Sequence, residues 1–353
     1  MHRFPFARNV GFLRAGDRRS CARLGSEPKN AHTRRRTGRD DFAPGTPGHA
    51  RWRAGLRTSS RAHSRGSQSR KGSQTAGMIR LLHIADLHFG REHRPLVDAF
   101  IDFCAAEPPD LIVATGDFTQ GARRKEFAAA RQFFDALPCP VIGAPGNHDV
   151  PSRALDHRFF TPWQRFERAL GGRIDPRLET ELVLGETLHT ARRAQMQLDW
   201  SLGRVSRSDA LVLSRKLESG AQPIKFVACH HPLIAPDGSK GRAKTKRGEH
   251  AAEILSGAAD LVMTGHLHQT FALPRTGQSH VCWFVGASTT FSERTRDEPS
   301  GFNEILIEAD RMELIHHESR EAKSFVPARR FELLRRPGEG EPEPIDLSGR
   351  AER

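Results

Sequence analysis

The chain has 353 residues, with 55 Lys or Arg against 42 Asp or Glu and a formal net charge of +13. The excess of basic residues lies in residues 1–77, which hold 18 Lys or Arg and 4 Asp or Glu, whereas residues 78–353 hold 37 and 38. A basic catalytic body, of the kind that binds nucleic acid through its charge, is therefore excluded.

Apolar runs and cysteines exclude two further classes of protein. No apolar run approaches the roughly 18–20 residues of a membrane-spanning helix, which excludes an integral membrane protein of the helical type. The five Cys are widely spaced and form no C-x-x-C pair, a pattern that favours a reducing compartment over a disulfide framework. We therefore expect a cytoplasmic protein.

Residues 1–77 are rich in Arg, Ser, Gly and Thr and show no apolar periodicity, so we expect this basic extension to be disordered. Its composition resembles an organelle transit peptide, and it also fits a basic arm for nucleic acid. Met78 opens the sequence Met-Ile-Arg-Leu-Leu-His-Ile-Ala-Asp, a buried-strand pattern with which compact domains commonly start. The pattern favours Met78 as the native start, in which case the extension is not part of the native protein.

From residue 78 onward, strand and helix patterns alternate. Apolar runs predict strands at 79–85, 111–115, 141–145, 224–229 and 261–264, and helical periodicity covers 95–106, 123–137, 154–170, 208–218 and 248–255. Within 171–205, the runs 181–184 and 187–190 are consistent with a hairpin. Four further strands at 271–273, 281–285, 304–308 and 312–316 have no helices between them. This order predicts an α/β domain over 78–320 with a mixed second sheet, followed by a C-terminal extension over 321–353 that is loose from about residue 337.

Five of the predicted strands end in residues that commonly bind metals. The clusters are Asp86-Leu87-His88, Gly116-Asp117, Gly146-Asn147-His148-Asp149, His230-His231-Pro232 and Gly265-His266-Leu267-His268. Residues at i and i+2 leave a strand on the same side, so the Asp-x-His and His-x-His pairs can each grip one ion. Three of the clusters begin with a glycine, which allows a sharp turn and a close approach to an ion. Ligands bind at the carboxyl ends of strands in α/β sheets, so the five clusters predict one pocket.

The chemistry of these side chains points to two transition-metal ions. Carboxylate, amide and imidazole ligands without thiolates suit Mn²⁺, Fe²⁺ or Fe³⁺, Zn²⁺ and Co²⁺, and argue against a structural zinc finger or an iron–sulfur cluster. Seven strong ligands are too many for one ion and suit two ions that share a carboxylate. A pair of metals roughly 3.5–4 Å apart is suited to phosphoester hydrolysis.

The order Asp-x-His, Gly-Asp, Gly-Asn-His-Asp, His, Gly-His-x-His closely resembles the calcineurin-like metallophosphoesterase family, over residues 79–268. The resemblance implies a four-layer α/β/β/α sandwich with two mixed sheets and a dinuclear site at one edge. It implies that the first metal is held by Asp86, His88, Asp117 and His268, and the second by Asp117, Asn147, His230 and His266. It further implies that a hydroxide bridging both metals is the nucleophile, with His148 as a proton donor to the leaving oxygen or a partner for a phosphoryl oxygen. Asp149 would then orient His148.

Several residues near these motifs have plainer interpretations. Asp149 can equally be a turn residue before Val150-Pro151. His231 competes with its neighbour for the metal, and the family pattern favours His230. His83 points to the opposite face of its strand from Asp86, so we expect it to be a packing residue. The basic residues Lys240, Arg242, Lys244, Lys246 and Arg247 can attract an anionic substrate, although a solvated surface loop is the more common outcome. Arg123 and Arg124 either touch phosphate or lie on the surface at a helix start.

Within the family the motifs look most similar to bacterial cyclic-nucleotide phosphodiesterase-like members. The predicted function is therefore a phosphodiesterase with a small diester substrate, such as 3′,5′-cyclic AMP, a 2′,3′-cyclic nucleotide or a glycerophosphodiester. The alternative is a DNA-repair nuclease of the same family, because His-Ile-Ala-Asp-Leu-His-Phe-Gly resembles the opening of the sequence in those nuclease subunits. The nearly neutral charge of residues 78–353 argues against nucleic acid as a partner of the core. A third hypothesis is a non-catalytic scaffold module, against which the complete ligand set argues.

Overall fold

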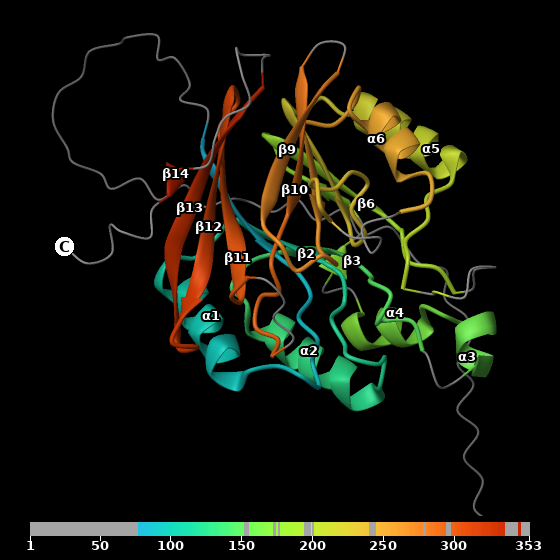
Figure 1. Ribbon diagram of the computed structural model, residues 1–353, viewed down its shortest axis with the longest axis vertical. Helices are drawn as coiled ribbons and strands as arrows, with labels where there is room; N and C mark the ends of the chain where they lie inside the picture. The colour runs from blue at the N-terminus through green and yellow to red at the C-terminus, as the bar shows by residue number, and fades with distance from the viewer. Residues whose placement is uncertain are drawn as a thin grey trace, which may run out of the picture. The chain divides into compact units, whose positions relative to one another are not determined.

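Two β-sheets lie face to face, and helices cover their outer faces (Figure 1). The computed structural model describes residues 77–151, 155–171, 174–175, 177–193, 199, 201–239, 245–277, 280–293, 298–335 and 345–346. All of these residues belong to one compact unit. The predictions for residues 1–76 and for the chain after residue 346 lie outside the described part.

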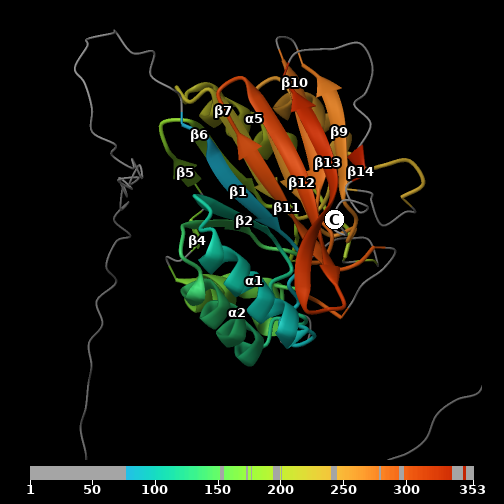
Figure 2. The ribbon, with the colours of Figure 1, turned by 90° about the vertical axis from the view of Figure 1, so that its left-hand side faces the viewer.

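The first sheet combines a parallel centre with an antiparallel half. Its described strands, in order across the sheet, are β14 (Ile345–Asp346), β13 (Ser324–Leu334), β12 (Arg311–Arg320), β11 (Gly301–Ile307), β1 (Ile79–Ile84), β2 (Leu111–Thr115), β3 (Val141–Ala144) and β4 (Ile174–Asp175). β1, β2, β3 and β4 run parallel, whereas β11 pairs antiparallel with β1 and begins a meander through β12 and β13. Figure 2 shows β1, β11, β12 and β13 side by side.

The second sheet has the same mixed character. Its described strands are, in order, β5 (Arg177–Glu179), β6 (Val183–Leu188), β7 (Ile224–Cys229), β8 (Leu261–Thr264), β10 (Val281–Gly286) and β9 (Phe271–Thr276). β6, β7, β8 and β10 are parallel, and the edge strands β5 and β9 pair antiparallel. The predicted architecture with two mixed sheets is thus confirmed.

Helices pack on the two outer faces, with α1 and α2 on the opposite side from α5 and α6 (Figure 1). The described helices are α1 (Arg94–Ala106), α2 (Arg124–Ala136), α3 (Leu155–Phe160), α4 (Gln164–Leu170), α5 (Arg207–Glu218) and α6 (Gly248–Leu255). Local sequence explains several helix starts: Pro95 occupies the first turn of α1, and the Ser206 hydroxyl accepts a hydrogen bond from the Asp209 amide at the start of α5. Among the described residues, no helix is long and apolar enough to cross a membrane.

Three buried apolar layers hold the four structural layers together. Side chains such as Leu81, Val113 and Phe226 fill the space between the sheets. A second layer joins the first sheet to α1, α2 and α4, and a third joins the second sheet to α5 and α6. Because β2 has all five side chains buried, its sequence is an uninterrupted apolar run rather than an alternating one. The predicted four-layer α/β/β/α sandwich is therefore observed.

Two predicted elements differ from the structure. The single helical stretch 154–170 is divided into α3 and α4, because Pro162 cannot continue a helix. The runs 181–184 and 187–190 form no hairpin: β6 is continuous across them and pairs parallel with β7. Gly185, which looks like a turn residue, instead makes room for a neighbouring ring, since an added Cβ would lie 2.1 Å from Cζ of Phe226.

The chain continues in the first sheet beyond the predicted domain end at residue 320. β13 pairs with β12 over its whole length, and Phe331 and Leu333 are buried in the layer between the sheets. Arg329 and Arg330 interrupt the apolar alternation of β13, which hides the strand from periodicity analysis.

Candidate metal centre

The five predicted clusters meet at one edge of the sandwich, where parallel strands of both sheets end. Asp86 and His88 follow β1, Asp117 follows β2, Asn147 and His148 follow β3, His230 follows β7, and His266 and His268 follow β8. Backbone hydrogen bonds join these loops: the Asp86 amide donates to the Gly116 carbonyl at 3.1 Å, and the Gly265 amide donates to the His230 carbonyl at 3.0 Å. The carboxyl ends of the strands thus form one site, as α/β sheets favour.

Two buried carboxylates occupy the middle of the site. Oδ2 of Asp86 accepts a hydrogen bond from the His266 amide at 2.7 Å, while Oδ1 lies 3.2 Å from Nε2 of His268. Oδ1 of Asp117 accepts a hydrogen bond from the His148 amide at 2.8 Å, while Oδ2 lies 3.3 Å from Nε2 of His230 and 3.8 Å from Nε2 of His88. Each carboxylate therefore has one oxygen fixed by the backbone and the other directed at imidazole nitrogens.

Most of these residues have a backbone conformation that residues other than glycine rarely adopt. Positive φ angles occur at Asp86 (51°), His88 (47°), Asp117 (52°), His266 (68°) and His268 (57°). The left-handed region costs free energy for such residues, and it persists where surrounding structure enforces it. Five of the seven predicted ligands share this strain, which is typical of functional sites.

Hydroxyl groups after β10 hold one of the strained turns, and the sequence analysis did not identify them. The Thr289 hydroxyl donates to the Asp86 carbonyl at 2.6 Å, and the Thr290 hydroxyl accepts a hydrogen bond from the Ala85 amide at 3.0 Å. Both residues are fully buried. Ser288-Thr289-Thr290 directly follows the carboxyl end of a strand parallel to β8, so the rule that found the ligand clusters could also have found this run.

Two glycines allow the loops to approach one another. An added Cβ at Gly146 would lie 2.1 Å from Oδ1 of Asp117, and one at Gly116 would lie 2.6 Å from Nδ1 of His230. Gly116 also has a φ of +80°, which side chains rarely adopt. The expectation that glycine permits close approach at these positions is met by the geometry.

Hydrogen bonding directs Nε2 of His230 into the site. Its Nδ1 donates to the Thr115 carbonyl at 2.9 Å, and its Nε2 lies 3.1 Å from Oδ1 of Asn147. Burial lowers the pKa of His230, but the Asp117 charge outweighs this effect and raises the pKa to about 9. Burial has the opposite effect on the Asp86 and Asp117 carboxyls, whose pKa it raises. Nearby histidines outweigh burial and hold the pKa of both carboxyls below the usual value. The site thus keeps its carboxylates ionised and favours a positive charge between them.

The unsatisfied atoms of the site fit metal ions. Among the described residues, both ring nitrogens of His88 are buried without a hydrogen-bond partner. Leaving such atoms unpaired is costly, and a cation bound by lone pairs removes that cost. Asp86, His88 and His268 offer ligand atoms that lie within 4.8 Å of one another, and so do Asp86, Asp117 and His230. The donors are oxygen and nitrogen, which suit Mn, Fe, Zn and Co ions.

His148 and its neighbour Asp149 have different surroundings. His148 is only partly buried, its Nδ1 donates to the Gln120 carbonyl at 2.7 Å, and its ring lies 4.9 Å from that of His88. Asp149 is fully buried and accepts hydrogen bonds from the amides of Gly146, Phe118 and Thr119 at 2.9, 3.2 and 2.9 Å, and from the Thr119 hydroxyl at 3.0 Å.

These contacts give Asp149 a different role from the one we expected. We expected it to orient the His148 ring, whereas the acceptor of the ring's Nδ1–H is the Gln120 carbonyl. Asp149 instead joins the loop after β2 to the loop after β3. Burial and the charge of Asp117 raise the pKa of its carboxyl to about 6.

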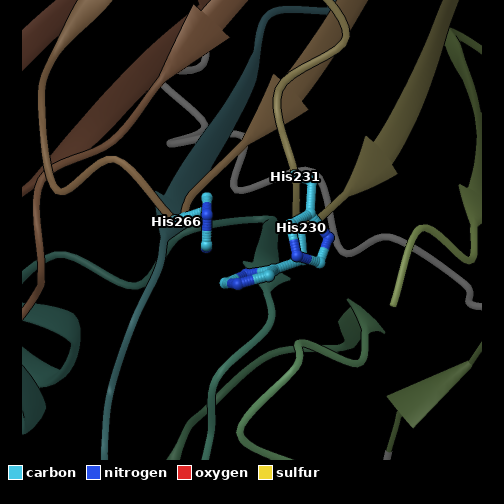
Figure 3. A group of neighbouring side chains, drawn as sticks. All are labelled: His230, His231 and His266. Atoms are coloured by element: carbon cyan, nitrogen blue, oxygen red, sulfur yellow. The ribbon is translucent and has the colours of Figure 1, made fainter. Parts of the chain in front are cut away.

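His231 lies beside the site with its nitrogens engaged elsewhere. Its Nδ1 lies 2.8 Å from the Thr190 hydroxyl, and its Nε2 donates to the Ser201 carbonyl at 2.8 Å. Figure 3 shows His230, His231 and His266 grouped at the ends of β7 and β8, and their nitrogens lie within 4.8 Å of one another.

Other residues singled out in the sequence lie away from these ligands or outside the description. His83 is fully buried, with Nε2 3.0 Å from the Thr115 hydroxyl, in keeping with the packing expected of it. Arg123 is half exposed, and its guanidinium lies 3.5 Å from the Glu126 carboxylate at the start of α2. Of the basic stretch, Lys240, Arg242 and Lys244 lie outside the described residues.

Comparisons with known proteins identify the family of this chain. Residues 79–270, more than half of the chain, match the family described as Calcineurin-like phosphoesterase. A probable cyclic nucleotide phosphodiesterase from Synechococcus sp. is 24% identical over 207 residues, which cover 57% of this chain and 73% of the relative. The glycerophosphodiester phosphodiesterase GpdQ from Enterobacter lignolyticus is 37% identical over 89 residues, which cover 22% of this chain and about a third (32%) of the relative.

Solved structures share the fold at lower identity. PhoD has a TM-score of 0.55 at 10% identity, with 77% of this chain and 72% of that chain covered. Purple acid phosphatase PPD1 from yellow lupin has a TM-score of 0.50 at 15% identity, with 71% of this chain and about half (53%) of that chain covered. The fold, the predicted family and the predicted enzyme class are confirmed: this chain belongs to the calcineurin-like phosphoesterase family of phosphoester hydrolases.

Proposed function

We propose that this protein is a phosphodiesterase that hydrolyses small diesters with the help of two metal ions. The observation that carries the proposal is the position of Asp117. Its Oδ2 lies 3.8 Å from Nε2 of His88, which is on the Asp86 side of the site, and 3.3 Å from Nε2 of His230, which is on the Asn147 side. One carboxylate oxygen thus faces both halves of the ligand set, which suits a residue shared by two ions.

The seven predicted ligands divide between two ions as the family resemblance implies. The first ion is held by Asp86, His88, Asp117 and His268, and the second by Asp117, Asn147, His230 and His266. The unpartnered nitrogens of His88 and the contact of Oδ1 of Asp86 with Nε2 of His268 support the first set. The contact of Nε2 of His230 with Asn147 and Asp117 supports the second. When bound, Mn²⁺, Fe²⁺/Fe³⁺, Zn²⁺ or Co²⁺ supplies Lewis acidity that neutralises phosphoryl charge and activates water.

His148 is the residue that acts on the leaving group. It is partly exposed, whereas Asp86, His88, Asp117, His230, His266 and His268 are buried, so a substrate can reach it more readily than those residues. Because Nδ1 donates to the Gln120 carbonyl, the proton transferred to the leaving oxygen is held at Nε2. Asp149 keeps this ring in place indirectly, through the backbone of the loop that carries it.

A small diester is the substrate class that the relatives favour. One relative is named as a probable cyclic nucleotide phosphodiesterase and another as a glycerophosphodiester phosphodiesterase. A cyclic nucleotide or a glycerophosphodiester is therefore the proposed substrate. The nearly neutral charge of residues 78–353 speaks against the DNA-repair nuclease, because a duplex-binding surface needs a basic footprint. The intact ligand set speaks against a non-catalytic scaffold.

We further propose a cytoplasmic location. Among the described residues, Cys104, Cys229 and Cys282 are buried thiols that form no disulfide. Free thiols persist in reducing compartments, whereas secreted proteins commonly pair them.

The test compares a diester with a monoester. The full chain is stripped of metal, reconstituted with Mn²⁺ and assayed on bis(p-nitrophenyl) phosphate and on p-nitrophenyl phosphate. We expect faster hydrolysis of the diester. On 3′,5′-cyclic AMP, whose leaving oxygen is an alkoxide that needs a proton, we expect His148→Ala to lower kcat by about 10²–10⁴-fold while its Mn²⁺ content stays at that of the wild type. Preference for the monoester would refute the proposal that the protein is a phosphodiesterase. Absence of turnover with Mn²⁺ bound would favour the hypothesis of a non-catalytic scaffold.

A further inference from the structure

His231 belongs to a ligand motif, yet its ring is committed to protein contacts on both sides. The Thr190 hydroxyl lies 2.8 Å from Nδ1 and also accepts a hydrogen bond from the His231 amide at 3.0 Å. Nε2 donates to the Ser201 carbonyl at 2.8 Å. A neutral imidazole has one donor and one acceptor nitrogen, and here both are used. A metal ligand needs a nitrogen lone pair, so this arrangement leaves none to offer.

The partner of the His231 ring is a short segment, residues 201–205, which comes from outside the five ligand motifs. Its second half is fixed by backbone hydrogen bonds: the Arg204 amide donates to the Thr190 carbonyl at 2.9 Å, and the Lys246 amide donates to the Gly203 carbonyl at 2.8 Å. Gly203 packs directly on the ring, because an added Cβ would lie 2.5 Å from Cβ and Cγ of His231. Ser201 is tied to the rest of the protein through the His231 bond.

The same ring lies against the candidate metal centre. Its centroid is 4.5 Å from that of His266 and 4.7 Å from that of His230 (Figure 3). Ser201 is therefore separated from His266 by a single imidazole. Two residues before it, the exposed Asp199 carboxylate accepts hydrogen bonds from the Ser201 amide at 3.0 Å and the Ser201 hydroxyl at 2.5 Å. Residues 201–205 thus border the site on the His266 side and hold a carboxylate there.

We infer that His231 is a positioning residue, which holds residues 201–205 beside His266 as one wall of the substrate pocket. The inference rests on the proposed function, since the pocket is that of the diester. The Asp199 carboxylate, fixed by Ser201, accepts hydrogen bonds from hydroxyl groups on the alcohol part of the substrate. Sugar or glycerol hydroxyls are the groups of this kind in the proposed diesters. His231 thereby sets substrate affinity, while the seven other residues hold the ions.

Two substitutions at the same position separate this role from metal ligation. In His231→Gln, the side-chain amide reaches as far as Nε2 of histidine and can still donate to the Ser201 carbonyl. In His231→Asn, the shorter side chain can accept from the Thr190 hydroxyl but cannot reach Ser201. Because residues 203–205 keep their own backbone bonds, neither change should unfold the segment. Both proteins are prepared as full chains with Mn²⁺. Metal content, steady-state kinetics on 3′,5′-cyclic AMP and on glycerophosphocholine, which both carry hydroxyl groups, and amide hydrogen exchange of residues 201–203 are measured.

We expect His231→Asn to raise KM by roughly tenfold, the loss expected for one hydrogen bond, with kcat within about twofold and Mn²⁺ content at the wild-type level. Its 201–203 amides should exchange faster, and His231→Gln should restore both KM and exchange. Loss of Mn²⁺ in both variants would overturn the inference in favour of a ligand, and unchanged exchange and KM in His231→Asn would also overturn it. If the wild type with Mn²⁺ hydrolyses neither diester, the proposed function fails, while the exchange comparison still supports or overturns the positioning role.

Discussion

Replacement of Asp149 by alanine should destabilise the protein without touching a predicted metal ligand. The carboxylate accepts hydrogen bonds from the amides of Gly146, Phe118 and Thr119, and it is fully buried. Asp149→Ala removes the acceptor from all three amides. Each buried donor left unsatisfied costs about 1–3 kcal/mol, so the loss lies between about 3 and 9 kcal/mol. Water that enters the space left by the side chain can accept from some of these amides. We therefore expect the free energy of unfolding to fall by about 3 kcal/mol.

The assay is urea unfolding of the full chain in EDTA, because a bound metal would add its own stabilisation of the folded state. The matched control is Asp135→Ala on α2, where a half-exposed carboxylate lies 3.4 Å from the Arg131 guanidinium and a change of at most about 0.5 kcal/mol is expected. A difference between the two variants of less than about 1 kcal/mol would refute the assignment of Asp149 to the support of these loops.

Three other perturbations test separate parts of the structure. Gly146→Ala places a Cβ 2.1 Å from Oδ1 of Asp117 and should lower Mn²⁺ content, as measured by plasma mass spectrometry, whereas wild-type metal content would contradict the close packing. Burial raises the pKa of the Glu304 carboxyl, but hydrogen bonds from His317 and Arg80 outweigh burial and hold the pKa below its ordinary value of 4.5. Its contribution to stability is therefore present above about pH 4.5 and lost as the pH falls, so the destabilisation by Glu304→Gln in urea unfolding should shrink from pH 7 to pH 4; a pH-independent difference would contradict this sign. Burial raises the pKa of Cys104 and Cys229 to about 12, so both thiols should resist iodoacetamide at pH 8 until the protein is unfolded; rapid labelling of the native state would show that they are accessible.

Three central parallel strands were the most predictable part of the fold. β2, β7 and β8 have the bounds expected from their apolar runs, because strands buried on both faces leave an uninterrupted signal in the sequence. The position of the site followed from the same strands, since each run stops at a ligand cluster and parallel strands end at one edge. Sequence order was therefore sufficient to place Asp86 beside His268, residues that lie far apart in the chain.

Other features depend on tertiary contacts that have no periodic signal. The left-handed backbone at Asp86 and Asp117 is imposed by neighbouring loops, and nothing in the local sequence marks it. The partner of the His148 ring is a backbone carbonyl, that of Gln120, which any residue type can supply. β13 escaped prediction because pairing with β12, rather than apolar alternation, keeps it in the sheet. Such contacts are determined by the whole fold and become visible only in the structure.

Asp117 is proposed to be shared by two metal ions. The number of Mn²⁺ ions bound per chain tests this, measured by plasma mass spectrometry after dialysis for the wild type and for Asp117→Ala, with His148→Ala as the matched control. We expect about two ions in the wild type and in His148→Ala. We expect Asp117→Ala to retain fewer than one ion and to show no measurable turnover of bis(p-nitrophenyl) phosphate. An Asp117→Ala protein with full metal content and wild-type turnover would contradict the dinuclear site.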